Sequence, residues 1–132
     1  MVKKLLFLLI VQSFIINPSI SMEKETTFNK KLFDKAQSEG KVVVVSSWIK
    51  YCSSCASQMK VLKKAKSDGS LFDIKFKNIE YFTFDVTNKE IANLLNVKFQ
   101  TTLLIFKNNK EVYRSLGETT EDLIYDALKK AI

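Results

Sequence analysis

Apolar residues recur along the first half of the chain at two different spacings. Between residues 28 and 36 they fall at helical spacing, and Gly40 ends the pattern, which predicts a helix. The continuous β-branched run Val42–Val45 predicts a strand that is covered on both faces. From about residue 53 to 66 the apolar positions again share one face of a helix.

The middle of the chain continues the alternation. The stretch 79–86 (IEYFTFDV) is aromatic and β-branched and predicts a strand. Thr87 and Glu90 form a capping-box pattern for a short helix behind it. Residues 70–78 favour no element.

Two strands and a helix complete the pattern. The stretch 102–106 (TLLIF) predicts a strand, and Asn108-Asn109 indicates a turn into a second strand over 111–116. Thr119 and Asp122 are expected to cap a last helix. Strands that alternate with helices predict an α/β fold with a central mixed sheet flanked by helices.

The N-terminal segment has a different pattern. Two lysines precede the apolar run 5–16, and Ser19 and Ser21 supply small residues before a cut after residue 21. This is the pattern of a secretory signal peptide, and the run is shorter than the roughly 20 residues that span a bilayer. We therefore expect 1–21 to be a signal peptide and 22–132 to form one domain. The alternative is an uncleaved N-terminal membrane anchor.

Composition and charge narrow the function classes. The apolar content of 46% and charged content of 27% are ordinary for a globular domain. Loss of residues 1–21 lowers the net charge from +7 to +5, and the remaining lysines are spread along the chain. Spread charge favours solvated faces over a nucleic-acid surface, so no nucleic-acid partner is expected.

The candidate chemistry lies in the octapeptide WIKYCSSC, which holds the only two cysteines of the 132 residues. Outside the cytoplasm a stable cysteine pair becomes a disulfide, but a loop this short adds little stability. A redox-active dithiol is therefore favoured over a structural disulfide. Cys52, at a helix N-terminus, is predicted to be the nucleophile, and Cys55, one turn later, the resolving thiol.

The residues around the dithiol bear on the direction of electron flow. Ser53-Ser54 offers hydroxyls without charge, and the chain contains no histidine. A histidine cation between the cysteines would stabilise the thiolate, and hence the reduced state, and would make the couple more oxidising. Without one we expect a potential in the reducing half of the range from about −270 mV to about −120 mV.

Three segments carry a resemblance to a known family. SSWIKYCSSC (46–55), FDVT (84–87) and NVKFQTTLLIFKNNKEVYRSLG (96–117) resemble thioredoxins, and the resemblance covers about residues 28–131. Within this group the chain is similar to periplasmic thioredoxin-like reductases, including the C-terminal domain of the membrane disulfide-reductase relay. The resemblance implies a thioredoxin-like fold and a thiol–disulfide oxidoreductase.

The resemblance also assigns roles at the site. It implies substrate contact by Trp48, Tyr51, Gln100 and Thr101, with core packing as the alternative for Trp48. The family usually has a buried acid at the position of Ser46, so proton transfer from the resolving cysteine would use water or hydroxyls such as that of Ser46.

The largest departure from the family is at Thr101, which stands where thioredoxins have a cis-proline. The Gln100–Thr101 bond is expected to be either strained cis or trans in a reshaped loop. Phe99, just before this loop, is a binding-face residue or a buried plug.

The leading interpretation is an exported, monomeric oxidoreductase, most simply periplasmic. It would act on protein thiols and disulfides, use no cofactor beyond its own disulfide, and could draw electrons from a membrane donor.

One alternative is a metal or iron–sulfur carrier. It would need a second copy of the dithiol or an external thiol ligand, since two cysteines make half of a four-ligand site. The other is a thioredoxin-like chaperone without catalysis.

Overall fold

The computed structural model of the chain describes residues 24–67 and 78–132. The expected signal peptide and most of the ambiguous stretch 70–78 lie outside these residues. Within the described ranges, no helix combines the length and hydropathy needed to cross a membrane.

The elements occur in the order that the sequence predicts, and four strands form one sheet in the order β2-β1-β3-β4. β1 pairs parallel with β2 and antiparallel with β3, and β3 pairs antiparallel with β4. The predicted mixed sheet flanked by helices is therefore confirmed. The elements are α1 (Lys30–Ser38), β1 (Val42–Trp48), α2 (Ser53–Ser67), β2 (Ile79–Asp85), α3 (Lys89–Leu94), β3 (Thr102–Lys107), β4 (Lys110–Leu116) and α4 (Glu121–Ala131).

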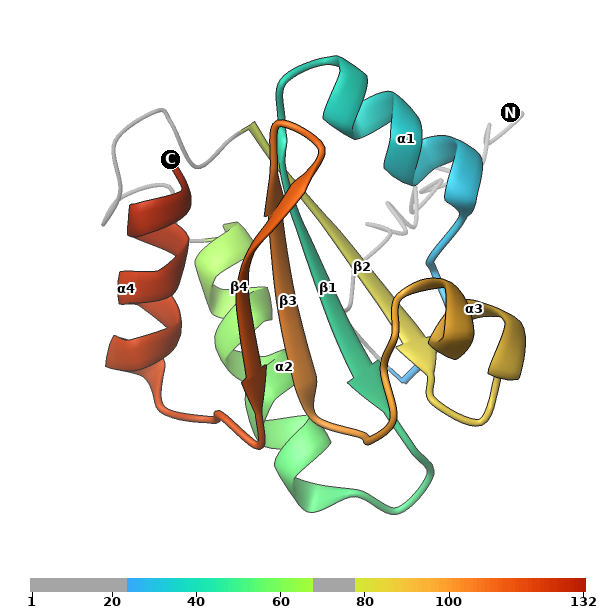
Figure 1. The fold of residues 1–132 in the computed structure, drawn as a ribbon. Helices are drawn as coiled ribbons and strands as arrows, with labels where there is room; N and C mark the ends of the chain where they lie inside the picture. Colours follow the sequence, from blue (N-terminus) through green and yellow to red (C-terminus); the bar gives the residue numbers. More distant parts are fainter. Residues whose placement is uncertain (1–23, 68–77) are drawn as a thin grey trace, which may run out of the picture.

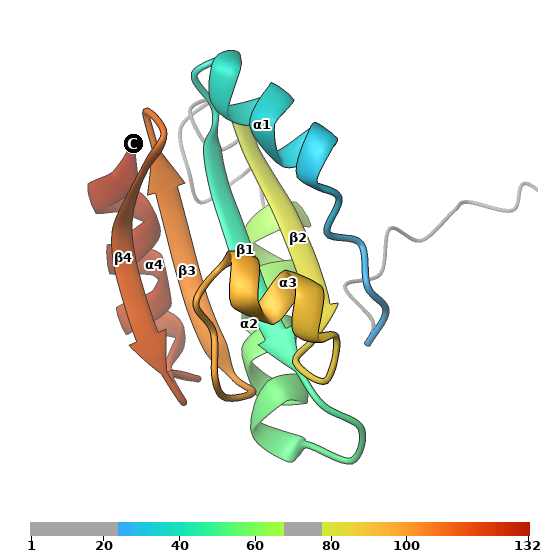
Figure 2. The same cartoon turned by 45° about the vertical axis from the view of Figure 1, so that its right-hand side comes forward.

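Helices cover both faces of the sheet, with α1 and α3 on one side and α2 and α4 on the other (Figure 1 and Figure 2). β1 supplies core residues to both sides, because successive side chains of a strand point to opposite faces. Val43 and Val45 pack toward α1 and α3, whereas Val42 and Val44 pack toward α2 and α4. This confirms that the valine run is a strand covered on both faces.

Two predicted helix caps are wrong by one residue. The cap of α3 is Asn88, whose side chain accepts a hydrogen bond from the Ile91 N–H. The Thr87 hydroxyl instead donates to the Asp85 carboxylate at 2.8 Å. This side-chain hydrogen bond holds Thr87 in the turn before the helix, so the next residue, Asn88, takes the N-cap position.

The start of α4 also differs from the expected cap by Thr119 and Asp122. Thr120 is the N-cap residue and makes no side-chain capping bond. The Glu118 carboxylate accepts from the Thr120 N–H at 2.7 Å, and this bond is the main cause that lowers the pKa of Glu118. One leucine on each of α1, α3 and α4 is about half exposed: Leu32, Leu94 and Leu123.

The corrected cap gives a stability prediction. Asn88→Ala should lower the free energy of unfolding by about 1 kcal/mol, because it leaves a helix N–H without its acceptor. Thr87→Ala removes a bond outside the helix and should cost less. Urea denaturation of the two variants checks the order, and a larger loss for Thr87→Ala would restore the capping-box prediction.

Candidate active site

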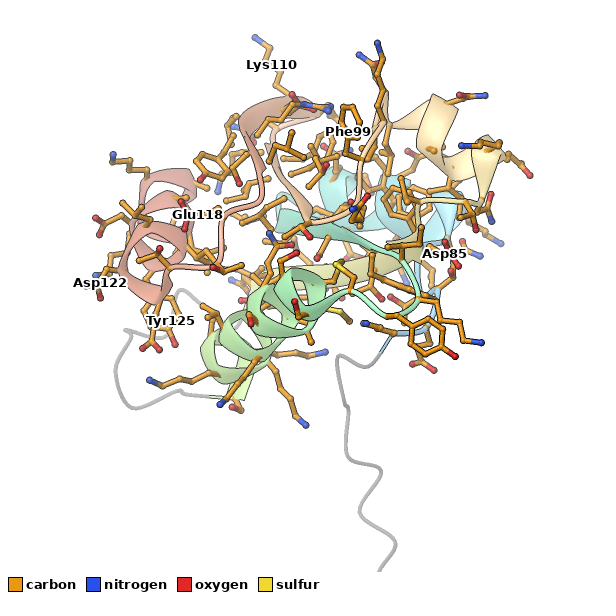
Figure 3. All side chains as sticks on the ribbon, turned by 90° about the horizontal axis from the view of Figure 1, so that it is seen from below. Asp85, Phe99, Lys110, Glu118, Asp122 and Tyr125 are labelled. Atoms are coloured by element: carbon orange, nitrogen blue, oxygen red, sulfur yellow. A yellow bond between two sulfur atoms is a disulfide. The ribbon has the colours of Figure 1, made fainter. Side chains whose placement is uncertain are left out.

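The predicted dithiol lies at one end of the sheet, where β1 ends and α2 begins (Figure 3). β1 ends at Trp48, and a short turn leads to α2 at Ser53. Tyr51 has a positive φ of 60° in that turn, and Cys52 directly precedes the helix. The strand therefore delivers Cys52 to the helix N-terminus as the sequence predicts.

Cys52 and Cys55 form a disulfide, with their Cα atoms 5.3 Å apart. Cys52 is partly exposed, while Cys55 is fully buried. The Cys55 N–H is one of the groups in the first helical turn that have no partner within the helix. It donates to the Cys52 sulfur at 3.1 Å. Such donors and the helix dipole stabilise negative charge. This geometry is therefore suited to Cys52 as the thiolate that attacks substrate and to Cys55 as the buried resolving thiol.

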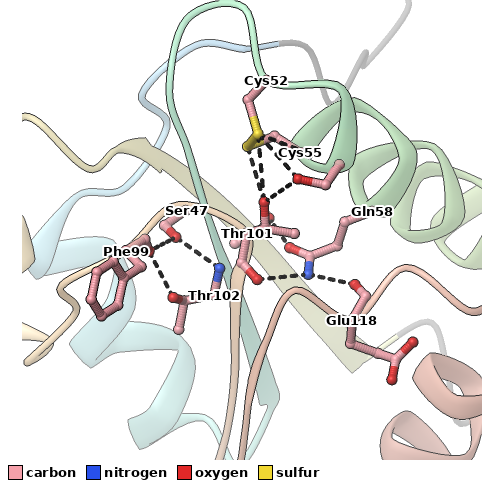
Figure 4. Close-up of a disulfide and its surroundings, with 10 residues drawn as sticks. Ser47, Cys52, Cys55, Gln58, Phe99, Thr101, Thr102 and Glu118 are labelled. Atoms are coloured by element: carbon pink, nitrogen blue, oxygen red, sulfur yellow. Dashed lines mark hydrogen bonds between the residues drawn. A yellow bond between two sulfur atoms is a disulfide. The ribbon is translucent and has the colours of Figure 1, made fainter.

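Thr101 faces the two sulfurs from the loop before β3 (Figure 4). Its hydroxyl oxygen lies 3.2 Å from the Cys55 sulfur, 3.5 Å from the Cys52 sulfur and 2.9 Å from the Ser54 hydroxyl. The sulfurs of a disulfide carry no proton, so in this state the hydroxyls are the donors. The position that the resemblance assigns to the family's proline thus carries a polar group in contact with the dithiol.

The loop at Thr101 is reshaped rather than cis. No peptide bond in the described ranges is cis, so Gln100–Thr101 is trans, and Thr101 has a φ of +58°. A β-branched residue rarely occupies this region, and the strain costs about 1–3 kcal/mol. The surrounding chain supports it: the Thr101 N–H donates to the Ser47 carbonyl at 2.8 Å, and its carbonyl accepts from the Gly117 N–H at 2.8 Å.

Ser46, whose hydroxyl is expected to assist proton transfer from Cys55, makes a buried hydrogen bond to another side chain. It is fully buried near the end of β1, and its hydroxyl donates to the Gln58 amide oxygen at 2.6 Å. The hydroxyl that contacts the Cys55 sulfur belongs to Thr101 instead. The proton role of Ser46 itself stays a prediction.

Gln58 is a site residue that sequence reasoning missed. Its side chain is fully buried in α2, and its amide nitrogen donates to the Thr101 carbonyl at 3.3 Å and the Glu118 carbonyl at 2.8 Å. One side chain therefore connects β1, α2 and the loops on either side of the β3–β4 pair. A signal was present, because Gln58 lies three residues after Cys55 and four before Leu62, on the face that the sequence predicts to be buried.

The aromatic residues of the site lie at its rim. Tyr51 is 89% exposed, with the Lys50 ammonium 5.1 Å from its ring centroid. Phe99 is 57% exposed, which excludes the buried-plug alternative, and Gln100 is exposed as well. Trp48 is partly buried and donates its indole N–H to a backbone carbonyl at 3.3 Å. The substrate roles of these residues stay predictions.

Candidate metal ligands do not gather in the part of the chain that the structure describes. No three side chains among its cysteines, aspartates and glutamates lie close enough to hold one ion. A carrier built on this site would therefore still need a second copy of the dithiol or an external thiol as its other ligands.

Comparisons with known proteins agree with this geometry. The thioredoxin family model matches residues 19–130. Thioredoxin-1 of Saccharomyces cerevisiae is 29% identical over 101 residues, covering 76% of this chain and 86% of that protein. Thioredoxin H-type of Fagopyrum esculentum is 27% identical over 99 residues, covering 74% of this chain and 78% of that protein.

A solved structure extends the match to the fold. Trxlp from Edwardsiella tarda superposes with a TM-score of 0.68 at 25% identity, covering 76% of this chain and 94% of that one. The relatives and the Cys52–Cys55 disulfide together support thiol–disulfide oxidoreductase activity. The family match spans most of the chain, which therefore belongs to the thioredoxin family.

Proposed function

We propose that this protein is an exported oxidoreductase that reduces protein disulfides or passes electrons in a relay. The observation that carries the proposal is the asymmetry of the disulfide. Cys52 is partly exposed and accepts a hydrogen bond from a helix N–H, whereas Cys55 is fully buried. Attack on a substrate requires the first property, and release from the mixed disulfide requires the second sulfur within one helical turn. The thioredoxin relatives favour protein disulfides as the substrate class.

The direction of electron flow follows from the charges at the site. Thiolate stabilisation by a cation makes a couple oxidising, because it favours the reduced state. Here the residues between the cysteines are serines, and the Lys50 ammonium lies over the Tyr51 ring. We therefore assign the couple to the reducing side, with a thiol donor, such as a membrane dithiol protein, needed to reset it.

Reduction of insulin disulfides tests the activity. With dithiothreitol as donor, the purified protein should accelerate precipitation of the insulin B chain in proportion to its concentration. The uncatalysed reaction with dithiothreitol alone is the control. A rate equal to this control would contradict the proposal and favour the chaperone alternative.

Export is a separate part of the proposal, supported by the basic, apolar and small-residue pattern of residues 1–21. A fusion of this segment to alkaline phosphatase, which is active only where its disulfides form, should show activity in a bacterial host. Replacement of the two lysines and the apolar run by polar residues should abolish it. An inactive fusion with the native segment would remove the periplasmic assignment and leave the chemistry intact.

A further inference from the structure

Two hydroxyls connect the buried sulfur of the site to solvent. The Thr101 hydroxyl oxygen is 3.2 Å from the Cys55 sulfur and 2.9 Å from the Ser54 hydroxyl oxygen. Cys55 is fully buried and Thr101 is 2% exposed, whereas Ser54 lies on the exposed surface of α2. The three side chains therefore form one hydrogen-bonded path from the protein interior to water (Figure 4).

Resolution of a mixed disulfide creates a need for such a path. Cys55 must lose its proton before it can attack, because the thiolate and not the thiol is the nucleophile. A fully buried thiol has no direct access to solvent, and burial disfavours its anion. The position of the family's buried acid holds Ser46, whose hydroxyl already donates to Gln58.

We propose that the Thr101 and Ser54 hydroxyls carry the Cys55 proton to solvent during resolution, an inference that rests on the proposed function. The Cys52 thiolate first attacks a substrate disulfide, forms a mixed disulfide and releases one substrate thiolate. The Cys55 S–H then gives its proton to the Thr101 oxygen while the Thr101 O–H passes its own to Ser54, and Ser54 releases one to water. The Cys55 thiolate attacks the Cys52 sulfur, the bond to substrate breaks, and the second substrate thiolate leaves.

The geometry allows the path to run in this direction and then reset. The Ser54 oxygen also lies 3.3 Å from the Cys52 sulfur. Ser54 can therefore donate to Thr101 while Thr101 donates to a sulfur, or Thr101 can donate to Ser54 while Ser54 donates to Cys52. Both arrangements satisfy both hydroxyls, so rotating two O–H bonds restores the path after each proton leaves.

The reaction of the reduced protein with 5,5′-dithiobis(2-nitrobenzoate) separates the two chemical steps. Attack by Cys52 releases one thionitrobenzoate at a rate that depends on reagent concentration. Resolution by Cys55 releases the second at a rate that does not. Thr101→Val keeps the branched shape but lacks the hydroxyl, and should slow the second phase relative to the first by at least about tenfold.

Matched variants show whether the hydroxyl is responsible. Thr101→Ser should restore the ratio of the two phases, and Ser54→Ala, an exposed change that leaves the core intact, should slow the second phase by less than Thr101→Val. Thr102→Val is the control, because Thr102 is buried next to Thr101 at the start of β3 but donates its hydroxyl to the Phe99 carbonyl. It should leave the ratio unchanged.

The outcomes distinguish the proton path from the proposed function. An unchanged ratio in Thr101→Val, an unchanged second phase in Ser54→Ala, or equal slowing in Thr101→Val and Thr101→Ser would overturn the path while leaving the dithiol chemistry in place. Failure of the unmodified protein to release two thionitrobenzoates would instead overturn the proposed function.

Discussion

Cys52→Ser should abolish disulfide reduction, with a fall in rate of at least about 10³-fold. Cys52 carries the accessible sulfur of the pair, and the Cys55 N–H donates to it at 3.1 Å. A serine hydroxyl in the same place stays protonated at neutral pH and cannot form a disulfide with substrate. The insulin assay with dithiothreitol measures the loss, which should bring the rate to that of dithiothreitol alone.

Cys55→Ser is the matched control for this variant. Its accessible Cys52 can still attack substrate, but no second sulfur follows one turn behind. The product should be a stable mixed disulfide with one substrate molecule, visible by mass spectrometry and released by reductant. Turnover in Cys52→Ser, or trapping by Cys52→Ser rather than Cys55→Ser, would reverse the assigned roles.

Gln58→Met should lower the free energy of unfolding of the oxidised protein by about 2–4 kcal/mol. Methionine fills a similar volume but replaces none of the hydrogen bonds that Gln58 makes to Ser46, Thr101 and Glu118. The Ser46 hydroxyl is then buried without its acceptor, and the strained Thr101 loop loses one of its supports. Urea denaturation, followed by tryptophan fluorescence, measures the change.

A double-mutant cycle with Ser46→Ala tests the reason for that loss. Ser46→Ala alone leaves the Gln58 amide oxygen buried without its donor and should cost about 1–3 kcal/mol. The double variant removes both partners, so it should cost less than the sum of the single variants. Additivity to within about 0.5 kcal/mol would contradict the hydrogen bond as the source of the stability.

The regular elements and the dithiol were predictable because local sequence determines them. A strand with helices on both faces needs apolar side chains in both directions, so the run Val42–Val45 identifies β1 without ambiguity. Its C-terminal end then fixes the place of Cys52 and Cys55. The caps at Asn88 and Thr120 were less predictable, since neighbouring polar residues compete for the same N–H groups.

The environment of the sulfurs was only partly predictable. The resemblance placed Thr101 near the dithiol, but it left the peptide geometry open. The trans bond and positive φ accompany hydrogen bonds with Ser47 and Gly117, which are distant from Thr101 in the sequence. Ser47 belongs to β1, and Gly117 follows the whole β3–β4 hairpin. Gln58 was missed because a search for apolar periodicity passes over a polar residue on a buried face, even where its spacing fits.

The reduction potential of the Cys52–Cys55 couple, measured by equilibration with dithiothreitol or glutathione, is the most direct test of the proposed function. We expect a reversible two-electron couple below about −220 mV, typical of a reductant or a component of an electron relay. A potential above about −150 mV would make the protein an oxidant or isomerase and reverse the direction of electron flow. The absence of any reversible couple would contradict the redox function itself.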